Sequence, residues 1–141
     1  MKIYLAARYT RRDELREYAK ALRALGHEVT SRWLAERKDP GCTVDDVTEG
    51  EHLRIAERDL EDIAAADMFV AFTREPKGNK RGGHHVELGY ALAREKEIIL
   101  LEGRENSFHY LEGIDFFETF EEFLVALQEA EPTEAPIGAR R

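Results

Sequence analysis

Short apolar segments alternate along this chain with longer segments in which apolar residues recur at helical spacing. This alternation predicts an α/β domain, with a doubly wound, mostly parallel sheet of the Rossmann or flavodoxin type and helices on both faces. The expected strands are residues 2–6, 27–32, 67–72 and 97–101, and the expected helices are 12–25, 48–65, 84–95 and 119–130. Ligands of such sheets bind at the carboxyl ends of the strands, so we expect the site on loops 6–11, 73–86 and 102–110.

Several helix ends carry recognisable end signals. Thr10 is placed to cap the first helix, and Gly26 stands where a glycine commonly follows a helix. Thr48 and Glu51 form a T-x-x-E capping box for the second helix. These signals fix the expected helix boundaries.

The rest of the chain reads as connections and a tail. Residues 34–47 are polar and contain a Pro-Gly pair, which is typical of a surface loop, and residues 103–117 are also loop-like. We expect one domain over residues 1–130, followed by a loose tail at 131–141 that contains two prolines.

Composition narrows the class of protein. The 141 residues are 43% hydrophobic and 35% charged, which is typical of a soluble globular domain. Cys42 is the single cysteine, and neither a secretory signal nor an apolar run of membrane-spanning length is present, so we expect a cytoplasmic protein. A net charge of −8 argues against a nucleic-acid polymer as partner and leaves a small molecule as the expected ligand.

One loop is basic although the chain as a whole carries a negative net charge. Residues 73–83 contain Lys80 and Arg81, followed by Gly82 and Gly83. The basic side chains suit a phosphate group, and paired glycines let the backbone approach a ligand closely. Arg8, on the loop after the first strand, is placed for the same role. Solvated surface charge explains these cations equally well.

Glu87 is the first candidate for chemistry. It follows the glycine-rich loop near the start of the third helix, where free N–H groups and the helix dipole are expected to keep its carboxylate ionised. An ionised carboxylate can attack an anomeric carbon and hold the sugar covalently, as in retaining glycosidases. The alternative is an acidic residue favoured by the helix start alone.

Asp59 and Tyr4 are further candidates. Asp59 interrupts the mostly apolar face of the second helix, formed by Leu53, Ile55, Ala56, Leu60, Ile63 and Ala64. A carboxylate there needs a ligand or a structural hydrogen bond. Tyr4 lies on the first strand, either as a core tyrosine or with its hydroxyl in the site.

The sequence predicts no metal site and no cofactor. His84 and His85 are adjacent, so on a helix their side chains are expected to diverge by about 100°. Neither a G-x-G-x-x-G motif nor a G-x-x-x-x-G-K-[ST] motif occurs, so a dinucleotide and a P-loop nucleotide site are unsupported.

Three segments together resemble the nucleoside 2-deoxyribosyltransferase family, which includes the 2'-deoxynucleoside 5'-phosphate N-hydrolases. They are KIYLA (2–6), ERDLEDIAAADMFVAF (57–72) and GGHHVELGYALAREKEIILL (82–101), and ENSFHYL (105–111) is a weaker match. The resemblance implies an enzyme that cleaves the N-glycosidic bond of a 2'-deoxynucleoside by a retaining covalent mechanism and transfers the sugar to another base.

The same resemblance implies roles for individual residues. Glu87 matches the nucleophile, Asp59 the carboxylate that assists proton transfer to the leaving base, and Tyr4 the tyrosine that orients the nucleophile. Asn106 matches a polar residue that extends into the site of a neighbouring subunit. A homo-oligomer with shared active sites is therefore implied.

The two residues expected near the 5' end of the substrate resemble different subfamilies. Arg81 stands six residues before Glu87, where transferases carry an aspartate and nucleotide hydrolases a phosphate-binding residue. Asn106, in contrast, looks like the transferase residue. Hydrolysis of a 2'-deoxynucleoside 5'-monophosphate thus remains an alternative, and so does a non-catalytic domain that senses a nucleotide.

Overall fold

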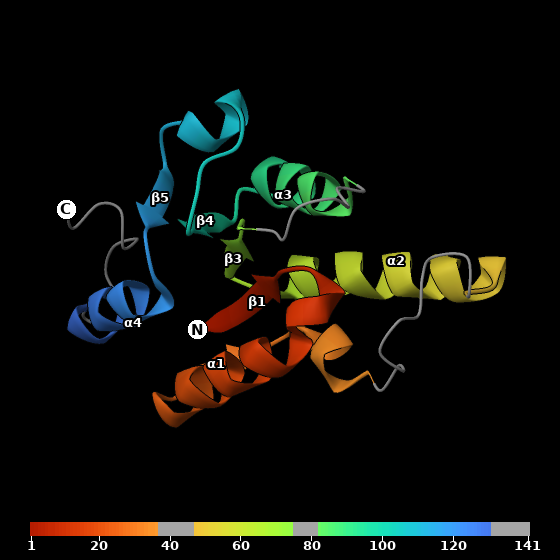
Figure 1. The fold of residues 1–141 in the computed structure, drawn as a ribbon, viewed down its shortest axis with the longest axis horizontal. Coiled ribbons are helices and arrows are strands. Elements are labelled where there is room, and N and C mark those ends of the chain that lie inside the picture. Colours follow the sequence, from red (N-terminus) through yellow and green to blue (C-terminus); the bar gives the residue numbers. More distant parts are fainter. Residues whose placement is uncertain (37–46, 75–81, 131–141) are drawn as a thin grey trace.

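The computed structural model describes residues 1–36, 47–74 and 82–130 and contains one five-stranded parallel sheet (Figure 1). Its strand order is β2-β1-β3-β4-β5, which is the flavodoxin-like order. The strands are β1 (Lys2–Ala6), β2 (Glu28–Val29), β3 (Met68–Phe72), β4 (Glu97–Leu101) and β5 (Ile114–Phe117). The predicted α/β class is confirmed, and the expected tail at 131–141 lies outside the described residues.

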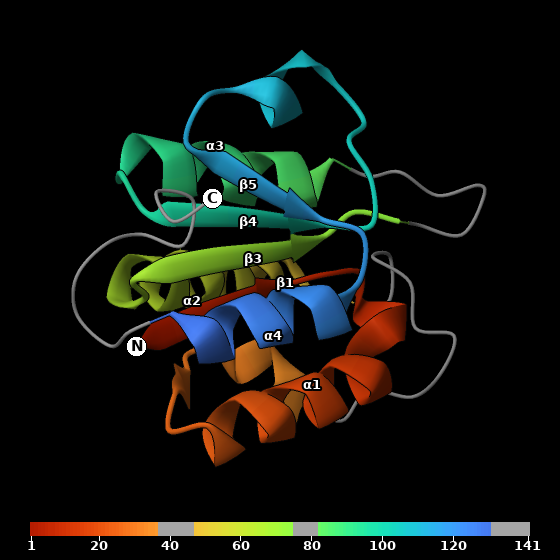
Figure 2. The ribbon, with the colours of Figure 1, turned by 90° about the vertical axis from the view of Figure 1, so that its left-hand side faces the viewer.

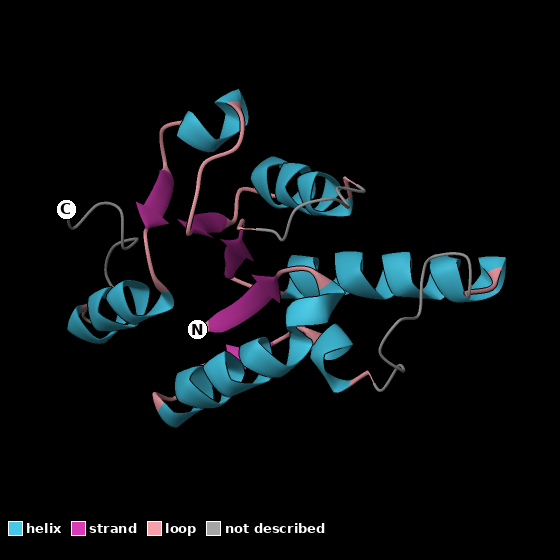
Figure 3. Cartoon of the chain, viewed as in Figure 1, coloured by secondary structure: helices cyan, strands magenta, loops and turns pink. Residues whose placement is uncertain are grey.

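Helices cover both faces of the sheet (Figures 1 and 2). On one face lie α1 (Arg12–Ala24) and α4 (Phe120–Glu129), where the rings of Tyr18 and Phe120 stack with centroids 4.1 Å apart. On the other face lie α2 (Glu49–Ala65) and α3 (Gly83–Ala93). Short 3-10 helices, drawn with the helices in Figure 3, complete the described chain: η1 (Tyr9–Arg11), η2 (Arg32–Ala35) and η4 (Ser107–Tyr110).

The core follows from this layering. All five residues of β3 are buried, because a central parallel strand is covered by helices on both sides and carries apolar residues without alternation. β1 and β4 are also buried over four residues each. Among the described helices, none is long and apolar enough to cross a bilayer.

Two strand predictions need correction. The expected strand at 27–32 is only the two-residue β2, because Ser31 turns its hydroxyl to the backbone of Leu5 and the chain enters η2. There the indole of Trp33 donates to the carbonyl of Leu5 at 2.9 Å. The loop-like region 103–117 contains β5, a four-residue edge strand whose IDFF sequence is too short to show a clear period.

Of the three helix-end predictions, those for Thr48 and Gly26 are confirmed and the one for Thr10 is wrong. The hydroxyl of Thr48 accepts from the backbone N–H of Glu51 at 3.2 Å, as the capping box predicts. Gly26 has φ +91° and ends α1 in the expected way. The Thr10 prediction is wrong: Thr10 lies inside η1, and Arg11, with no side-chain cap bond, precedes α1.

Candidate active site

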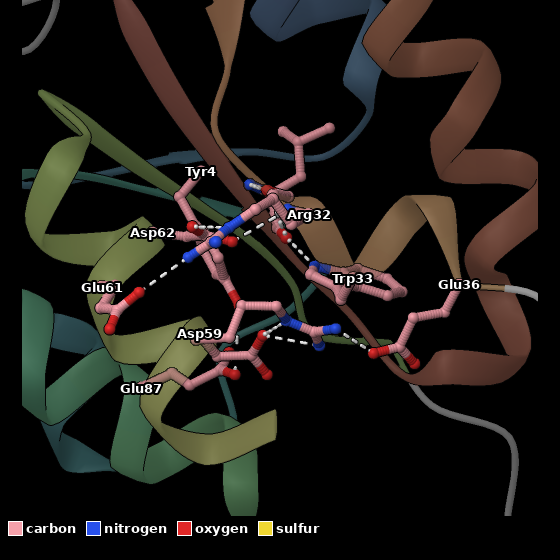
Figure 4. Close-up of polar contacts among 11 residues, drawn as sticks. Tyr4, Arg32, Trp33, Glu36, Asp59, Glu61, Asp62 and Glu87 are labelled. Carbon is pink, nitrogen blue, oxygen red and sulfur yellow. Dashed lines mark hydrogen bonds and ion pairs between the residues drawn. The ribbon is translucent and has the colours of Figure 1, made fainter. Parts of the chain in front are cut away.

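The candidate site lies where the strand order reverses. β1 and β3 are neighbours, and their connections run to opposite faces of the sheet, so the carboxyl ends of these two strands form the topological switch point. Tyr4 comes from β1, Asp59 from α2 and Glu87 from α3. Figure 4 shows the three side chains converging, with the Asp59 and Glu87 carboxylates next to each other.

Tyr4 joins the first strand to the third helix. Its hydroxyl donates to Oε1 of Glu87 at 3.3 Å, and its buried ring stacks on Phe69 with centroids 5.7 Å apart. Burial, and then the negative charges of Glu87 and Asp59, raise the pKa of Tyr4 well above its usual value. The hydroxyl therefore stays protonated and acts as a donor.

Glu87 holds its proton more tightly than an ordinary glutamate. Burial and then the charge of Asp59 raise its pKa from 4.5 to about 7, against the opposing effect of the Tyr4 hydrogen bond. Burial therefore outweighs the expected effect of the helix start, which was to keep this carboxylate ionised. Glu87 is the fifth residue of α3, and the dipole weakens beyond the first turn, so desolvation prevails.

Asp59 is partly buried and is paired with the residue before it. The Nε and NH2 groups of Arg58 both donate to Oδ1 of Asp59, at 3.2 and 3.0 Å. Burial raises the pKa of Asp59, and the Arg58 guanidinium opposes that rise. Such a carboxyl is suited to exchange a proton with a bound ligand.

Arg58 extends the network to a second carboxylate. Its NH1 group pairs with Glu36, which directly follows η2 (Figure 4). Arg12 and Arg16 of α1 donate to the backbone carbonyl of Glu36, so three arginines meet at this residue. Sequence reasoning missed Arg58 and Glu36. The available signal was the arginine adjacent to a carboxylate that interrupts an apolar face.

That apolar face is only partly buried. Ile63 is buried and Ile55 and Leu60 are half-buried, but Leu53 is 59% exposed and Ala56 is exposed. The reason is visible in Figure 1, where the N-terminal part of α2 extends beyond the sheet.

Only some of the residues predicted to bind phosphate lie in the described part of the chain. Arg8 is half-buried and precedes η1 at the carboxyl end of β1, as expected. Gly82 has φ +78° and precedes α3, a backbone conformation that favours glycine, and Gly83 begins the helix. Lys80 and Arg81 lie outside the described residues.

Asn106 lies away from Glu87 within one chain. Its side chain accepts from the N–H of Phe108 at 2.9 Å, so it caps η4. It lines a cavity of about 580 Å³ with residues of α3 and η4, namely His85, Leu88, Gly89, Leu92, Ser107 and Phe108. The α3 members of this lining lie about 100° to 160° around the helix from Glu87. Asn106 therefore does not join the Tyr4–Glu87 site of its own chain.

The two adjacent histidines do not diverge as expected. The ring centroids of His84 and His85 lie 3.9 Å apart, and both rings lie close to the segment after β4. Rotation about their side-chain bonds brings the two rings together although the Cα–Cβ directions differ.

The fold and the site together define a flavodoxin-like α/β domain with two carboxylates and a tyrosine at its topological switch point. The sequence profile of the family described as nucleoside 2-deoxyribosyltransferase matches residues 3–127. The chain therefore belongs to the nucleoside 2-deoxyribosyltransferase family. This membership supports a nucleoside deoxyribosyltransferase activity.

Solved structures show the same fold. A 2-deoxyribosyltransferase from Bacillus psychrosaccharolyticus is 20% identical with a TM-score of 0.67, and the match covers 94% of this chain and 93% of that one. A CMP N-glycosidase from Clostridium botulinum is 22% identical with a TM-score of 0.59, covering 92% and 100%. A conserved protein from Enterococcus faecalis is 17% identical with a TM-score of 0.58, covering 100% and 99%. A search of curated protein sequences found no match.

Proposed function

We propose that this protein cleaves the N-glycosidic bond of a 2'-deoxynucleoside and transfers the deoxyribosyl group to another base, with Glu87 as the nucleophile. The observation that carries the proposal is the hydrogen bond from Tyr4 to Glu87, with the Asp59 carboxyl beside it. A partly buried carboxylate held by a protonated tyrosine is arranged to attack an anomeric carbon.

The proposed reaction has two displacements. One carboxylate oxygen of Glu87 attacks C1', and the electron pair of the C1'–N bond leaves with the base, which takes a proton from Asp59. A nitrogen of a second base then attacks C1', the bond to Glu87 breaks, and the proton of the incoming base returns to Asp59. Two inversions give net retention at C1'.

Each polar residue has a distinct part in this scheme. Because the Tyr4 hydroxyl binds Oε1, it fixes the orientation of Glu87 and leaves the other oxygen as the attacking atom. Burial favours the protonated form of Asp59, which the departing base requires, whereas Arg58 limits this effect. Proton transfer and attack are thereby assigned to different carboxyl groups.

Hydrolysis of a 2'-deoxynucleoside 5'-monophosphate is the second candidate function. It is favoured by Arg81 six residues before Glu87 and by Arg8, which follows β1 at the carboxyl edge of the sheet. Arginine pairs well with phosphate. In this version water, in place of a second base, attacks the glycosylated Glu87.

We also propose that the enzyme is a homo-oligomer with shared sites. Asn106 lines a cavity with α3 residues that point away from Glu87, so it is better placed to complete the site of a second copy than its own. The exposed side chains of Val86 on α3 and Phe108 on η4, each 67% exposed, provide apolar surface for such a contact.

Product analysis tests these proposals. The purified protein is incubated with the four 2'-deoxynucleosides and, separately, with their 5'-monophosphates, each with and without an added free base. We expect a new nucleoside only when base is added, and no product from Glu87→Ala. Free base released from the monophosphates alone would favour the hydrolase. Ligand binding without turnover of any substrate would contradict both and favour a sensor.

A further inference from the structure

Three side chains with metal-binding atoms gather on the described part of the chain, apart from the Tyr4–Glu87 pair. His84 and His85 are in the first turn of α3, and Glu105 follows β4. One donor atom from each lies within 4.8 Å of the others, and Nε2 of His84 is 3.8 Å from Oε2 of Glu105. Two imidazole nitrogens and one carboxylate oxygen thus lie close to one another.

The donor types match a particular class of ion. Imidazole suits zinc, copper, iron and nickel, and a set of two histidines and one carboxylate leaves open positions for water or another ligand. Donor atoms on one tetrahedral zinc lie about 3.4 Å apart, from metal–ligand distances of about 2.1 Å. Closing the observed separations to this value requires side-chain shifts of about 1 Å, which rotation about χ angles supplies.

The segment that carries Glu105 is held in place by its own contacts. The backbone N–H of Glu105 donates to Nδ1 of His109 at 2.9 Å, and Asn106 caps η4 directly afterwards. The side chains of His84 and Glu105 are only 22% and 18% exposed. An ion would therefore meet two side chains with little exposed surface, His84 and Glu105, and the exposed imidazole of His85.

The electrostatic balance favours a cation despite the helix start. The first turn of α3 carries positive potential, which opposes a cation and is weak in comparison with metal–ligand bonds. The negative charge of the Glu105 carboxylate offsets this potential.

We propose that His84, His85 and Glu105 form a binding site for a divalent transition-metal ion of the zinc type, with three protein ligands and at least one open position. The ion joins the first turn of α3 to the segment between β4 and η4. His109 supports the site by holding the backbone of Glu105 and is not itself a ligand through Nδ1. The proposal does not depend on the deoxyribosyl-transfer reaction, in which no metal step is invoked.

Cobalt titration of the whole protein, prepared without a histidine tag and freed of metal by a chelator, tests the site. Co²⁺ substitutes for zinc and reports its coordination through visible absorption bands. We expect one Co²⁺ per chain, displaced by Zn²⁺. His84→Ala and Glu105→Gln should each weaken binding by about 10-fold or more, since loss of even a supporting partner of a metal ligand has that effect.

His52→Gln is the matched control, because His52 lies on α2 and is not one of the three residues, and it should bind Co²⁺ as the wild-type does. Circular dichroism of each metal-free variant checks that it is folded, and Glu105→Gln serves if His84→Ala does not fold. Absence of Co²⁺ binding, equal binding by wild-type and Glu105→Gln, or one ion per two chains would overturn the within-chain site.

Discussion

The hydroxyl of Tyr4 reaches Oε1 of Glu87 across 3.3 Å and 83 residues of sequence. The contact joins the strand and the helix that flank the switch point of the sheet. It orients Glu87 and also lowers its pKa against the larger effect of burial. Geometry and protonation of the proposed nucleophile therefore depend on one phenol.

Removing that phenol should change both rate and pH dependence. In Tyr4→Phe the hydrogen bond that lowers the pKa of Glu87 is lost, so the pKa rises further and the ionised fraction at neutral pH falls. We expect kcat/KM at pH 7 to fall by roughly 10- to 100-fold, in the range typical of lost positioning groups. The pH profile of kcat/KM should move to higher pH, whereas an unchanged profile would contradict this role.

The pKa of Glu87 also sets an activity profile for the wild-type enzyme. Only the ionised carboxylate attacks, so kcat/KM should rise with pH through an apparent pKa near 7. A rising limb near pH 4.5, the ordinary value, would contradict the burial effect. Initial rates between pH 5 and 9, with a substrate-independent check of enzyme stability, measure the limb.

The same pKa predicts how stability depends on pH. Between pH 4.5 and about 7 folded Glu87 keeps its proton while the unfolded chain has lost it, so the free energy of unfolding falls as pH rises through this window. Glu87→Gln does not ionise and escapes this loss. At pH 8 it should be more stable than wild-type by up to about 3 kcal/mol, and at pH 4 the difference should be smallest. Urea unfolding at both pH values measures this, with Glu57→Gln on α2 as control.

The sequence predicts those structural elements whose pattern lies within a few neighbouring residues, and it misses those that depend on distant contacts. β3 was readable because five consecutive buried residues are apolar, and α2 because Thr48 caps it. β5 was missed because four residues at a sheet edge, one of them Asp115, carry no period. The pattern of neighbouring residues therefore predicts a long helix or a central strand. It does not predict a short strand that pairs at the edge of the sheet.

Some features of the candidate site could likewise be predicted from the sequence, and others could not. Glu87, Asp59 and Tyr4 were selected from the sequence, and the structure brings their side chains together, although their catalytic roles remain predictions. The raised pKa of Glu87 was not predicted, because it depends on burial and on a carboxylate from another helix. Glu36 was missed because nothing local links it to Arg58, 22 residues away.

Arg58 should control the protonation of Asp59. Its guanidinium donates twice to Oδ1, and its charge opposes the burial effect. In Arg58→Gln the pKa of Asp59 should rise, which carboxyl carbon NMR titration measures without any substrate. Arg54→Gln, one turn earlier at an exposed position, is the control and should leave the pKa of Asp59 unchanged.

Shared active sites predict complementation between two inactive proteins. Asn106→Ala and Glu87→Ala should each have low activity alone, since one lacks the residue donated to a neighbour and the other the nucleophile. After mixing and subunit exchange, some sites combine an intact Glu87 with an intact Asn106, so activity should reappear. An Asn106→Ala enzyme with full activity, or a mixture without recovery despite exchange measured by mass, would show that each site is made by one chain.

Trapping the covalent intermediate tests the central claim most directly. A 2'-deoxy-2'-fluoro nucleoside slows turnover of a glycosylated carboxylate, so intact-protein mass spectrometry should show the mass of one fluorosugar added per chain. Peptide mapping should place it on Glu87, and Glu87→Gln should gain no mass. Turnover of the natural nucleoside with the adduct on another residue, or with inversion at C1' and no adduct, would contradict Glu87 as the nucleophile.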